Sequence, residues 1–153
     1  MKEIDIFTDC SGSTDELGIS FVIFDEEDEQ SFKFSSNVKL LNNEFVTHND
    51  MCSVLIGECY AVFKALSHIK NQQNTIARIY TDNEHVFRLL NNQSIIRKKK
   101  NDLIKIVRRT KRMKNNDIDI RWIKGHVGVY GNEMADKLAK NGRRKKTREH
   151  TSI

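Results

Sequence analysis

The chain of 153 residues has no proline, only three cysteines and no long run of apolar residues. Without proline, one of the usual markers of turns and helix ends is missing. Cys10, Cys52 and Cys59 are odd in number and lack CxxC spacing, which favours reduced thiols over a disulfide framework or a zinc site. No apolar run approaches membrane-spanning length, and the N-terminus lacks the apolar core of a signal peptide. We therefore expect a cytoplasmic protein.

Acidic residues are outnumbered, with 21 Asp and Glu against 26 Lys and Arg, so the formal net charge is +5. This excess favours an acidic partner such as nucleic acid. The hydrophobic fraction of 38% and the charged fraction of 31% are typical of a soluble globular protein and exclude a disordered one. The length suits one domain, which we place at residues 1–142. Residues 143–153 form a basic C-terminal tail that we expect to be flexible.

Hydrophobic periodicity predicts an alternating order of strands and helices. The predicted strands are residues 3–9, 17–24, 31–36, 75–81 and 117–123, and the predicted helices are 53–70, 83–91, 95–113 and 132–142. An early run of strands followed by alternating helices and strands indicates an α/β protein, with a mixed sheet and helices on its faces. No internal repeat or linker is visible, so the chain reads as a single unit.

Two predicted strands end in the same way, in an aromatic residue, a threonine and an aspartate. The stretches are "IFTDCSGS", which contains Asp9, and "IYTDNEHV", which contains Asp82. Parallel neighbouring strands would bring both carboxylates to one sheet edge, where open α/β sheets bind ligands. An aspartate after a strand can also simply cap a turn or a helix. The repetition of the pattern favours a functional role.

Two further carboxylates lie on predicted helices. Glu58 lies roughly 60° from the centre of the apolar stripe of its helix, so it needs a cation or a hydrogen-bond partner. Asp136 is spaced to form an ion pair with Lys140, so the pattern alone indicates a solvated face there. If the four carboxylates converge, they would repel one another unless they bound a divalent metal. Oxygen ligands of this kind suit Mg²⁺ or Mn²⁺.

Four motifs occur in the order that is typical of one family. They are "FTDCSG", "GECYAVFKAL", "YTDNEHV" and the long stretch "WIKGHVGVYGNEMADKLAK" at residues 122–140. Over roughly residues 3–141 the chain resembles type 1 ribonuclease H, the family that cleaves the RNA strand of RNA/DNA hybrids. The resemblance implies a ribonuclease H-like fold, a mixed sheet of five strands, three antiparallel and then two parallel, with helices on both faces.

The resemblance also implies an active site. It makes Asp9, Glu58, Asp82 and Asp136 the metal-binding carboxylates, which changes the interpretation of Asp136 from a surface ion pair to a site residue. It makes His126 a loop histidine that assists proton transfer or product departure. The implied reaction uses two Mg²⁺ ions, with Mn²⁺ as a substitute, and leaves a 5′-phosphate and a 3′-hydroxyl without a covalent intermediate.

The expected partner is an RNA/DNA hybrid duplex, bound by a monomer that does not use a membrane. Bases recur on one face of the predicted helix 95–113, and because that face is nearly free of acids, phosphate contact is favoured over a solvated face. For Asn132, capping of the last helix is the favoured alternative. The expected substrate-binding residues are Ser11, Asn83, Lys98, Lys105, Arg109, Arg112 and Asn132.

Two departures from the family pattern keep other functions open. Cys10 stands where the family has glycine, and Glu84 stands where glutamine is common. Both would suit a catalytically weak module that binds hybrids. A related metal nuclease that acts on DNA is a further alternative, because carboxylate clusters on this kind of fold serve several reactions. The full set of four carboxylates favours an enzyme over a binding module.

Overall fold

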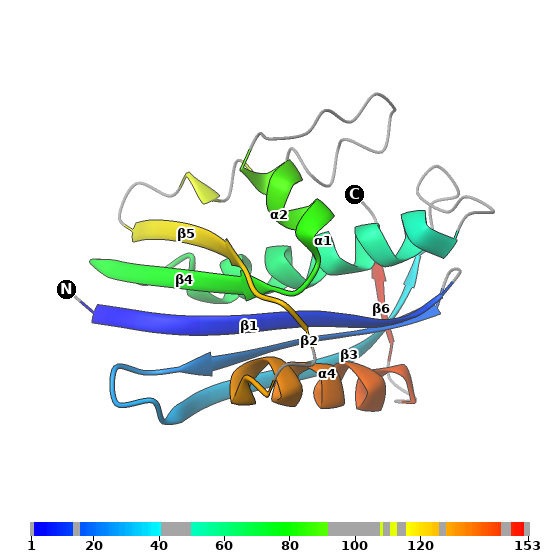
Figure 1. Cartoon of the computed structure of the whole chain (residues 1–153), viewed down its shortest axis with the longest axis horizontal. Helices are drawn as coiled ribbons and strands as arrows, with labels where there is room; N and C mark the ends of the chain where they lie inside the picture. The colour runs from blue at the N-terminus through cyan, green and yellow to red at the C-terminus, as the bar shows by residue number, and fades with distance from the viewer. Residues whose placement is uncertain are drawn as a thin grey trace.

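The structure is a computed structural model that describes residues 2–13, 16–40, 50–91, 108, 111–112, 116–125, 128–144 and 148–151. Its elements are shown in Figure 1: β1 (Lys2–Ser13), β2 (Glu16–Phe24), β3 (Gln30–Leu40), α1 (Asp50–Ile69), β4 (Thr75–Thr81), α2 (Glu84–Leu90), β5 (Asn116–Trp122), α4 (Tyr130–Arg143) and β6 (Arg148–Thr151). None of the helices in these ranges is both long enough and apolar enough to cross a membrane. The predicted helix 95–113 lies mostly outside the described residues.

The sheet has the strand order β5-β4-β1-β2-β3-β6. β1 pairs antiparallel with β2, and β2 with β3, whereas β1–β4 and β4–β5 are parallel pairs. The predicted mixed sheet of five strands is therefore confirmed, and β6 is a sixth strand. β6 pairs in parallel with β3, from Asn37↔Arg148 to Leu40↔Thr151. Four residues of the tail that was expected to be flexible thus pair with the sheet.

Helices lie on both faces of the sheet, with α1 and α2 on one face and α4 on the other (Figure 1). The larger core cluster joins the sheet to α1 and α2, and it includes Ile6, Phe21 and Leu66. A second cluster lies under α4 and contains Val22 and Phe24, together with Ala135. Because β2 contributes to both clusters, all of its residues after Glu16 are buried, as its continuous apolar run predicts.

Small residues of the sheet let helix α4 pack with its backbone against the strands. The hydroxyls of two strand serines donate to carbonyls of the helix, Ser20 to Ala135 O at 2.5 Å and Ser35 to Leu138 O at 2.6 Å. Gly18 lies directly under the carbonyl of Ala139, where any side chain would clash with the helix backbone. These contacts fix the position of α4 relative to β1, β2 and β3.

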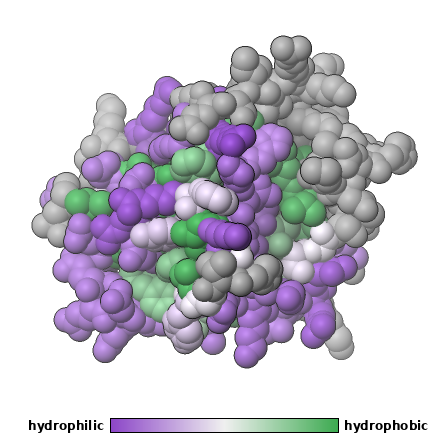
Figure 2. Space-filling view, in the orientation of Figure 1, coloured by the Kyte–Doolittle hydropathy of each residue, from purple (hydrophilic) through white to green (hydrophobic). Residues whose placement is uncertain are grey.

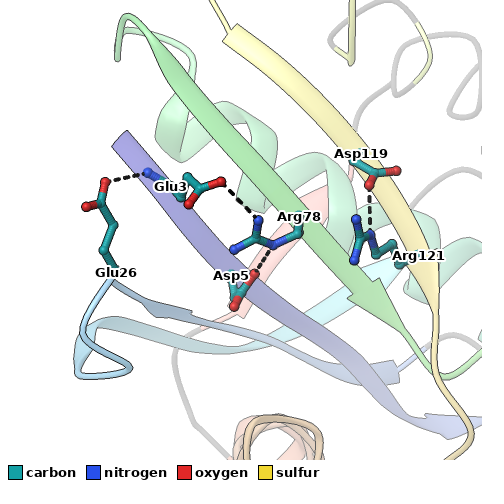
Figure 3. Close-up of polar contacts among 6 residues, drawn as sticks. All are labelled: Glu3, Asp5, Glu26, Arg78, Asp119 and Arg121. Carbon is teal, nitrogen blue, oxygen red and sulfur yellow. Dashed lines mark hydrogen bonds and ion pairs between the residues drawn. The ribbon is translucent and has the colours of Figure 1, made fainter. Parts of the chain in front are cut away.

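Ion pairs lie on β1, β4 and β5 (Figure 3). Arg78 of β4 donates to Asp5 of β1 with an N–O distance of 2.7 Å and reaches Glu3 at 3.4 Å. Arg121 of β5 pairs with Asp119 at 2.7 Å. Seen from the side shown in Figure 1, the surface is mainly hydrophilic, with scattered hydrophobic residues (Figure 2). The acidic side chains at the start of β1 are thus matched by arginine.

Candidate metal-binding active site

The candidate site forms where two parallel strands separate. β1 and β4 are paired from Lys2↔Thr75 to Phe7↔Tyr80, and Asp9 and Asp82 follow beyond the last pair. α1 crosses this point and contributes Glu58. Carboxylate oxygens of Asp9, Glu58 and Asp82 all lie within 4.8 Å of one another. The structure therefore brings together three of the four carboxylates that the sequence singled out.

Burial and mutual repulsion control the protonation of this cluster. Asp9 is 4% exposed and Glu58 is 3% exposed. Burial, and after it the charge of Asp82, raises the pKa of Asp9 to about 8. Burial and the charge of Asp9 raise the pKa of Glu58 well above its usual range. Because carboxylate oxygens of the two side chains lie within 4.8 Å of each other, their charges repel strongly when both groups are ionised. Without a cation, the cluster therefore retains protons near neutral pH.

The residues of this cluster fit a hard divalent cation. Glu58 Oε2 is buried and has no hydrogen-bond partner among the residues that the structure describes, so a strong acceptor lies unused there. All of the neighbouring donor atoms in the cluster are carboxylate oxygens, the ligands that Mg²⁺ and Mn²⁺ prefer. A cation bound here would satisfy Glu58 Oε2 and offset the repulsion between the carboxylates.

Asp136 borders the cluster from the opposite face of the sheet. It lies on α4, and its charge contributes to the raised pKa of Asp9. Its carboxylate forms the predicted ion pair with Lys140, with an N–O distance of 3.0 Å, and its side chain is 26% exposed. Asp136 is not among the three carboxylates that meet within 4.8 Å. The predicted ion pair of Asp136 is therefore present, and its role as a metal-binding residue stays a prediction.

The segment after β5 runs past Asp82. The indole of Trp122 donates to the Asp82 carbonyl at 3.3 Å. Gly125 lies so close to the Asp82 side chain that a Cβ on Gly125 would be 3.1 Å from Oδ2. His126, the next residue and the expected proton-transfer group, lies outside the described residues. The described part of this loop therefore leads to the carboxylates.

Cys10 is accommodated by a glycine on α1. Its side chain points to the face of β1 opposite Asp9, where its sulfur contacts the backbone of Gly57, and a Cβ on Gly57 would clash with that sulfur. Burial and the charge of Glu58 raise the pKa of the Cys10 thiol well above its usual range. Cys10 therefore packs as a small apolar residue. The role of Gly57 cannot be read from the sequence, because no local pattern shows which residues face each other across two elements.

Two of the expected substrate-binding residues, Asn83 and Asn132, lie at the starts of helices. Asn83 caps α2, since its Oδ1 accepts a hydrogen bond from the Val86 N–H at 3.0 Å. Asn132 is buried in the first turn of α4. The interpretation of Asn132 as the cap of that helix is wrong, because the helix begins earlier and its N-cap residue is Val129, with no side-chain cap.

The remaining expected substrate contacts are partly described. Ser11 lines a cavity of about 450 Å³ together with Lys140, Arg143 and Arg144. Arg112 is exposed, and Lys98, Lys105 and Arg109 lie outside the described residues. Two other bases of the same segment bind the end of α2: Arg108 Nε donates to the Leu89 carbonyl at 2.8 Å, and Lys111 to Asn91 Oδ1 at 2.9 Å. Glu84 is paired with Arg88 at 2.7 Å.

Comparison with known proteins gives a consistent result. The family model described as RNase H matches residues 1–144. A ribonuclease H of Actinobacillus succinogenes is 31% identical over 98% of this chain and 96% of its own length. The N-terminal RNase H domain of rv2228c from Mycobacterium tuberculosis, solved as a fusion with maltose binding protein, superposes with a TM-score of 0.73 at 14% identity and covers 94% of each chain. LC11-RNase H1 in complex with an RNA/DNA hybrid gives 0.64 at 14% identity, covering 90% of this chain and 97% of that one.

Proposed function

The chain belongs to the ribonuclease H family of endonucleolytic hydrolases, and on that basis we propose that it cleaves the RNA strand of RNA/DNA hybrids. The observation that carries the proposal is the cluster of Asp9, Glu58 and Asp82, with its unused buried oxygen Glu58 Oε2. The related fold of LC11-RNase H1, which has been solved with an RNA/DNA hybrid, supports this choice of substrate.

The proposed reaction depends on two Mg²⁺ ions, for which Mn²⁺ can substitute. Asp9, Glu58 and Asp82 would hold them, with Asp136 completing the site from α4. The chemistry that such ions supply is activation of a water molecule and stabilisation of charge on the scissile phosphate. The proposed products carry a 5′-phosphate and a 3′-hydroxyl.

The side chains of the chain itself prepare this chemistry. Because the pKa values of Asp9 and Glu58 are raised, these groups would release protons when a cation binds. Lys140 holds Asp136 through their ion pair, which keeps that carboxylate beside the cluster. We further propose that His126 assists proton transfer or product departure, because Gly125 places the preceding backbone against Asp82.

The proposal is tested with an RNA strand labelled at its 5′ end and paired to DNA, in Mg²⁺ and separately in Mn²⁺. We expect internal cuts in the hybrid and none in the same RNA unpaired. Asp9→Asn should abolish the cuts, whereas Asp5→Asn, on the same strand and face but paired with Arg78, should not. An intact hybrid in the presence of folded wild-type protein would overturn the proposal.

The same assay separates the alternatives. Cutting of duplex or single-stranded DNA in place of the hybrid would indicate a DNA nuclease. Tight, salt-dependent binding of the hybrid without cutting would indicate a binding module. The structure weakens the case for that module, since Cys10 packs against Gly57 and the charge of Glu84 is paired with Arg88. The free thiols of Cys10 and Cys59 suit the cytoplasm, the location that we propose.

A further inference from the structure

A cavity lined mainly by basic residues lies beside the carboxylate cluster. Its volume is about 450 Å³, and it is lined by Ser11, Lys140, Arg143 and Arg144. Three of the four lining residues are bases and the fourth offers a hydroxyl, so the cavity presents hydrogen-bond donors together with positive charge. Such a lining suits an anion that has several oxygen atoms, as phosphate does.

Helix α4 runs along β1 in the same direction. The candidate metal site and the cavity therefore follow one another along this pair of elements. Gly131, in the first turn of α4, packs against the ring of Phe7. Further along, the charge of Asp136 acts on Asp9. At the end of the helix, Arg143 passes so close to Gly12 that a Cβ there would be 3.1 Å from Arg143 Nε.

The spacing along β1 places the cavity one short step from the cluster. Asp9 and Ser11 point to the same face of β1, since side chains alternate along a strand. Two strand residues span roughly 7 Å. This spacing is comparable with the distance between neighbouring phosphates on one strand of a nucleic acid. A nucleic-acid backbone that runs along β1 with one phosphate at Asp9 would therefore bring its next phosphate to the cavity.

The two arginines of the cavity are available for an outside anion. Lys140 is already paired with Asp136, at 3.0 Å. Within the described ranges, Arg143 and Arg144 form no ion pair with an acidic side chain. Bases at the end of a helix can also act by opposing the helix dipole. That general effect does not explain why Arg143 lies across Gly12 and faces Ser11 in a shared cavity.

The end of α4 that carries these arginines is held rigidly. The Arg143 carbonyl accepts a hydrogen bond at 2.8 Å from Nδ2 of Asn37, which is fully buried. Gly142 lies against the Ser36 carbonyl, where a Cβ would be 2.6 Å from the oxygen. A rigid backbone lowers the entropy that a side chain must lose on binding. The cavity is therefore preorganised at its base, and only the arginine side chains need to adjust.

We propose that this cavity binds the backbone phosphate adjacent to the scissile phosphate on the cleaved strand, with Arg143 and Arg144 as the recognising groups and Ser11 as an additional donor. The proposal rests on the function proposed above. Arginine suits this role because its planar guanidinium binds two phosphate oxygens at once. This contact would set the register of the strand across the carboxylates and would carry no information about base sequence.

The test uses a hybrid whose cleaved strand has ribonucleotides only in a short central window, so that the cut position is fixed. One phosphate beside the cut is replaced by a neutral methylphosphonate, in separate substrates for each side. For the wild type we expect kcat/KM to fall by about 10-fold to 100-fold on one side, as for loss of a charged hydrogen bond. Equal, small effects on both sides would overturn the proposal, and this arm needs no variant.

The second arm uses Arg143→Ala/Arg144→Ala, with Lys2→Ala/Lys70→Ala as the charge-matched control on exposed lysines elsewhere. We expect the arginine variant to lose a similar factor on the unmodified hybrid and little more on the methylphosphonate substrate. With Asp9→Asn added to prevent cutting, its binding of the hybrid should show a salt slope that is lower by about one for each phosphate it no longer binds. Additive losses in the arginine variant would show that the phosphate is bound elsewhere.

The outcomes distinguish this inference from the proposed function. If wild-type protein fails to cut the unmodified hybrid, the proposed function fails. If it cuts, and the arginine variant behaves as the lysine control does, the phosphate subsite is wrong while the function stands. Thermal melting of both variants checks that each is folded, and Arg143→Lys/Arg144→Lys, which keeps the charge but loses the planar fork, should fall between wild type and the alanine variant.

Discussion

Asp9 and Asp82 lie at matching positions, each two residues beyond the last paired residues of two parallel strands, Phe7 and Tyr80. β1 continues along β2 as far as Ser13, whereas β4 ends at Thr81. The strands therefore separate at the point where both carboxylates emerge, and Glu58 of α1 reaches the same point. This divergence brings the carboxylates of two strands and one helix to a single point at the edge of the sheet.

Removal of any one cluster carboxylate should abolish activity without unfolding the protein. For Asp9→Asn, Glu58→Gln and Asp82→Asn we expect hybrid cleavage to fall on the order of 100-fold to 1,000-fold, as for other preorganised groups that stabilise charge in a transition state. Binding of the hybrid should persist, because the proposed phosphate contacts lie outside the cluster. Cleavage rates and filter binding measure the two effects. A variant that loses both equally would indicate misfolding, which a melting curve detects.

Without metal, stability should depend on pH through Asp9. The pKa of Asp9 is about 8 in the folded protein, whereas the reference value of an aspartate, 3.8, applies to the unfolded chain. Between these values the folded protein keeps a proton that the unfolded chain releases, so stability falls as pH rises from about 4 to about 8. Asp9→Asn cannot ionise and should lose part of this slope.

The measurement is thermal melting in a chelator at pH 5 and at pH 8.5. We expect Asp9→Asn to melt above the wild type at pH 8.5 and to differ less at pH 5. A rise of roughly 2–4 °C would correspond to about 1 kcal/mol at this chain length. Excess Mg²⁺ should reverse the order at pH 8.5, because only the wild type has the full ligand set. A difference independent of pH would contradict the assigned pKa.

Cys10 and Gly57 should be coupled. In Gly57→Ala the new Cβ would clash with the Cys10 sulfur and would lie 2.8 Å from a methyl group of Leu17, so we expect a loss of about 1–3 kcal/mol. Cys10→Gly in the same protein removes the sulfur and should restore part of that loss, with the Leu17 contact remaining. Urea unfolding of the two single variants and the double variant gives the coupling energy. Strictly additive losses would mean that the two residues do not interact.

Ser20→Ala should loosen α4 and weaken the site at a distance. The buried hydroxyl donates to the Ala135 carbonyl next to Asp136, so its loss should cost about 1 kcal/mol and lower the affinity for Mg²⁺. Thermal melting and a Mg²⁺ titration of cleavage measure these effects. Ser31→Ala is the matched control, because its hydroxyl bonds to the Ile23 carbonyl within the sheet. If both variants needed the same Mg²⁺ concentration, the prediction would be wrong, and the docking of α4 would not affect the metal site.

The predictable part of the molecule is the part with strong local patterns. The apolar run of β2 and the apolar stripe of α1 indicated the correct elements, and the order of the elements indicated the mixed sheet. The repeated strand endings predicted that Asp9 and Asp82 lie at one edge of the sheet, because parallel neighbouring strands run in the same direction.

The parts that sequence reasoning missed depend on contacts between distant segments. β6 is a short polar stretch without alternation, so nothing local marks it as a strand. The helix α4 begins at Tyr130, ahead of the glycine and asparagine that would ordinarily suggest a start, which misled the interpretation of Asn132. The cavity near Ser11 exists only because α4 runs along β1, and the basic end of α4 reads in the sequence as the beginning of a tail.

The hydrogen bonds that dock α4 end on its backbone, at the carbonyls of Ala135 and Leu138. Every residue type carries a carbonyl, so these anchors do not depend on which side chains the helix displays. The position of the helix therefore does not depend on the side chains of its exposed surface. If α4 binds the substrate as proposed, substitutions on its outer side would change substrate binding, while the docking contacts would keep Asp136 in place beside the cluster.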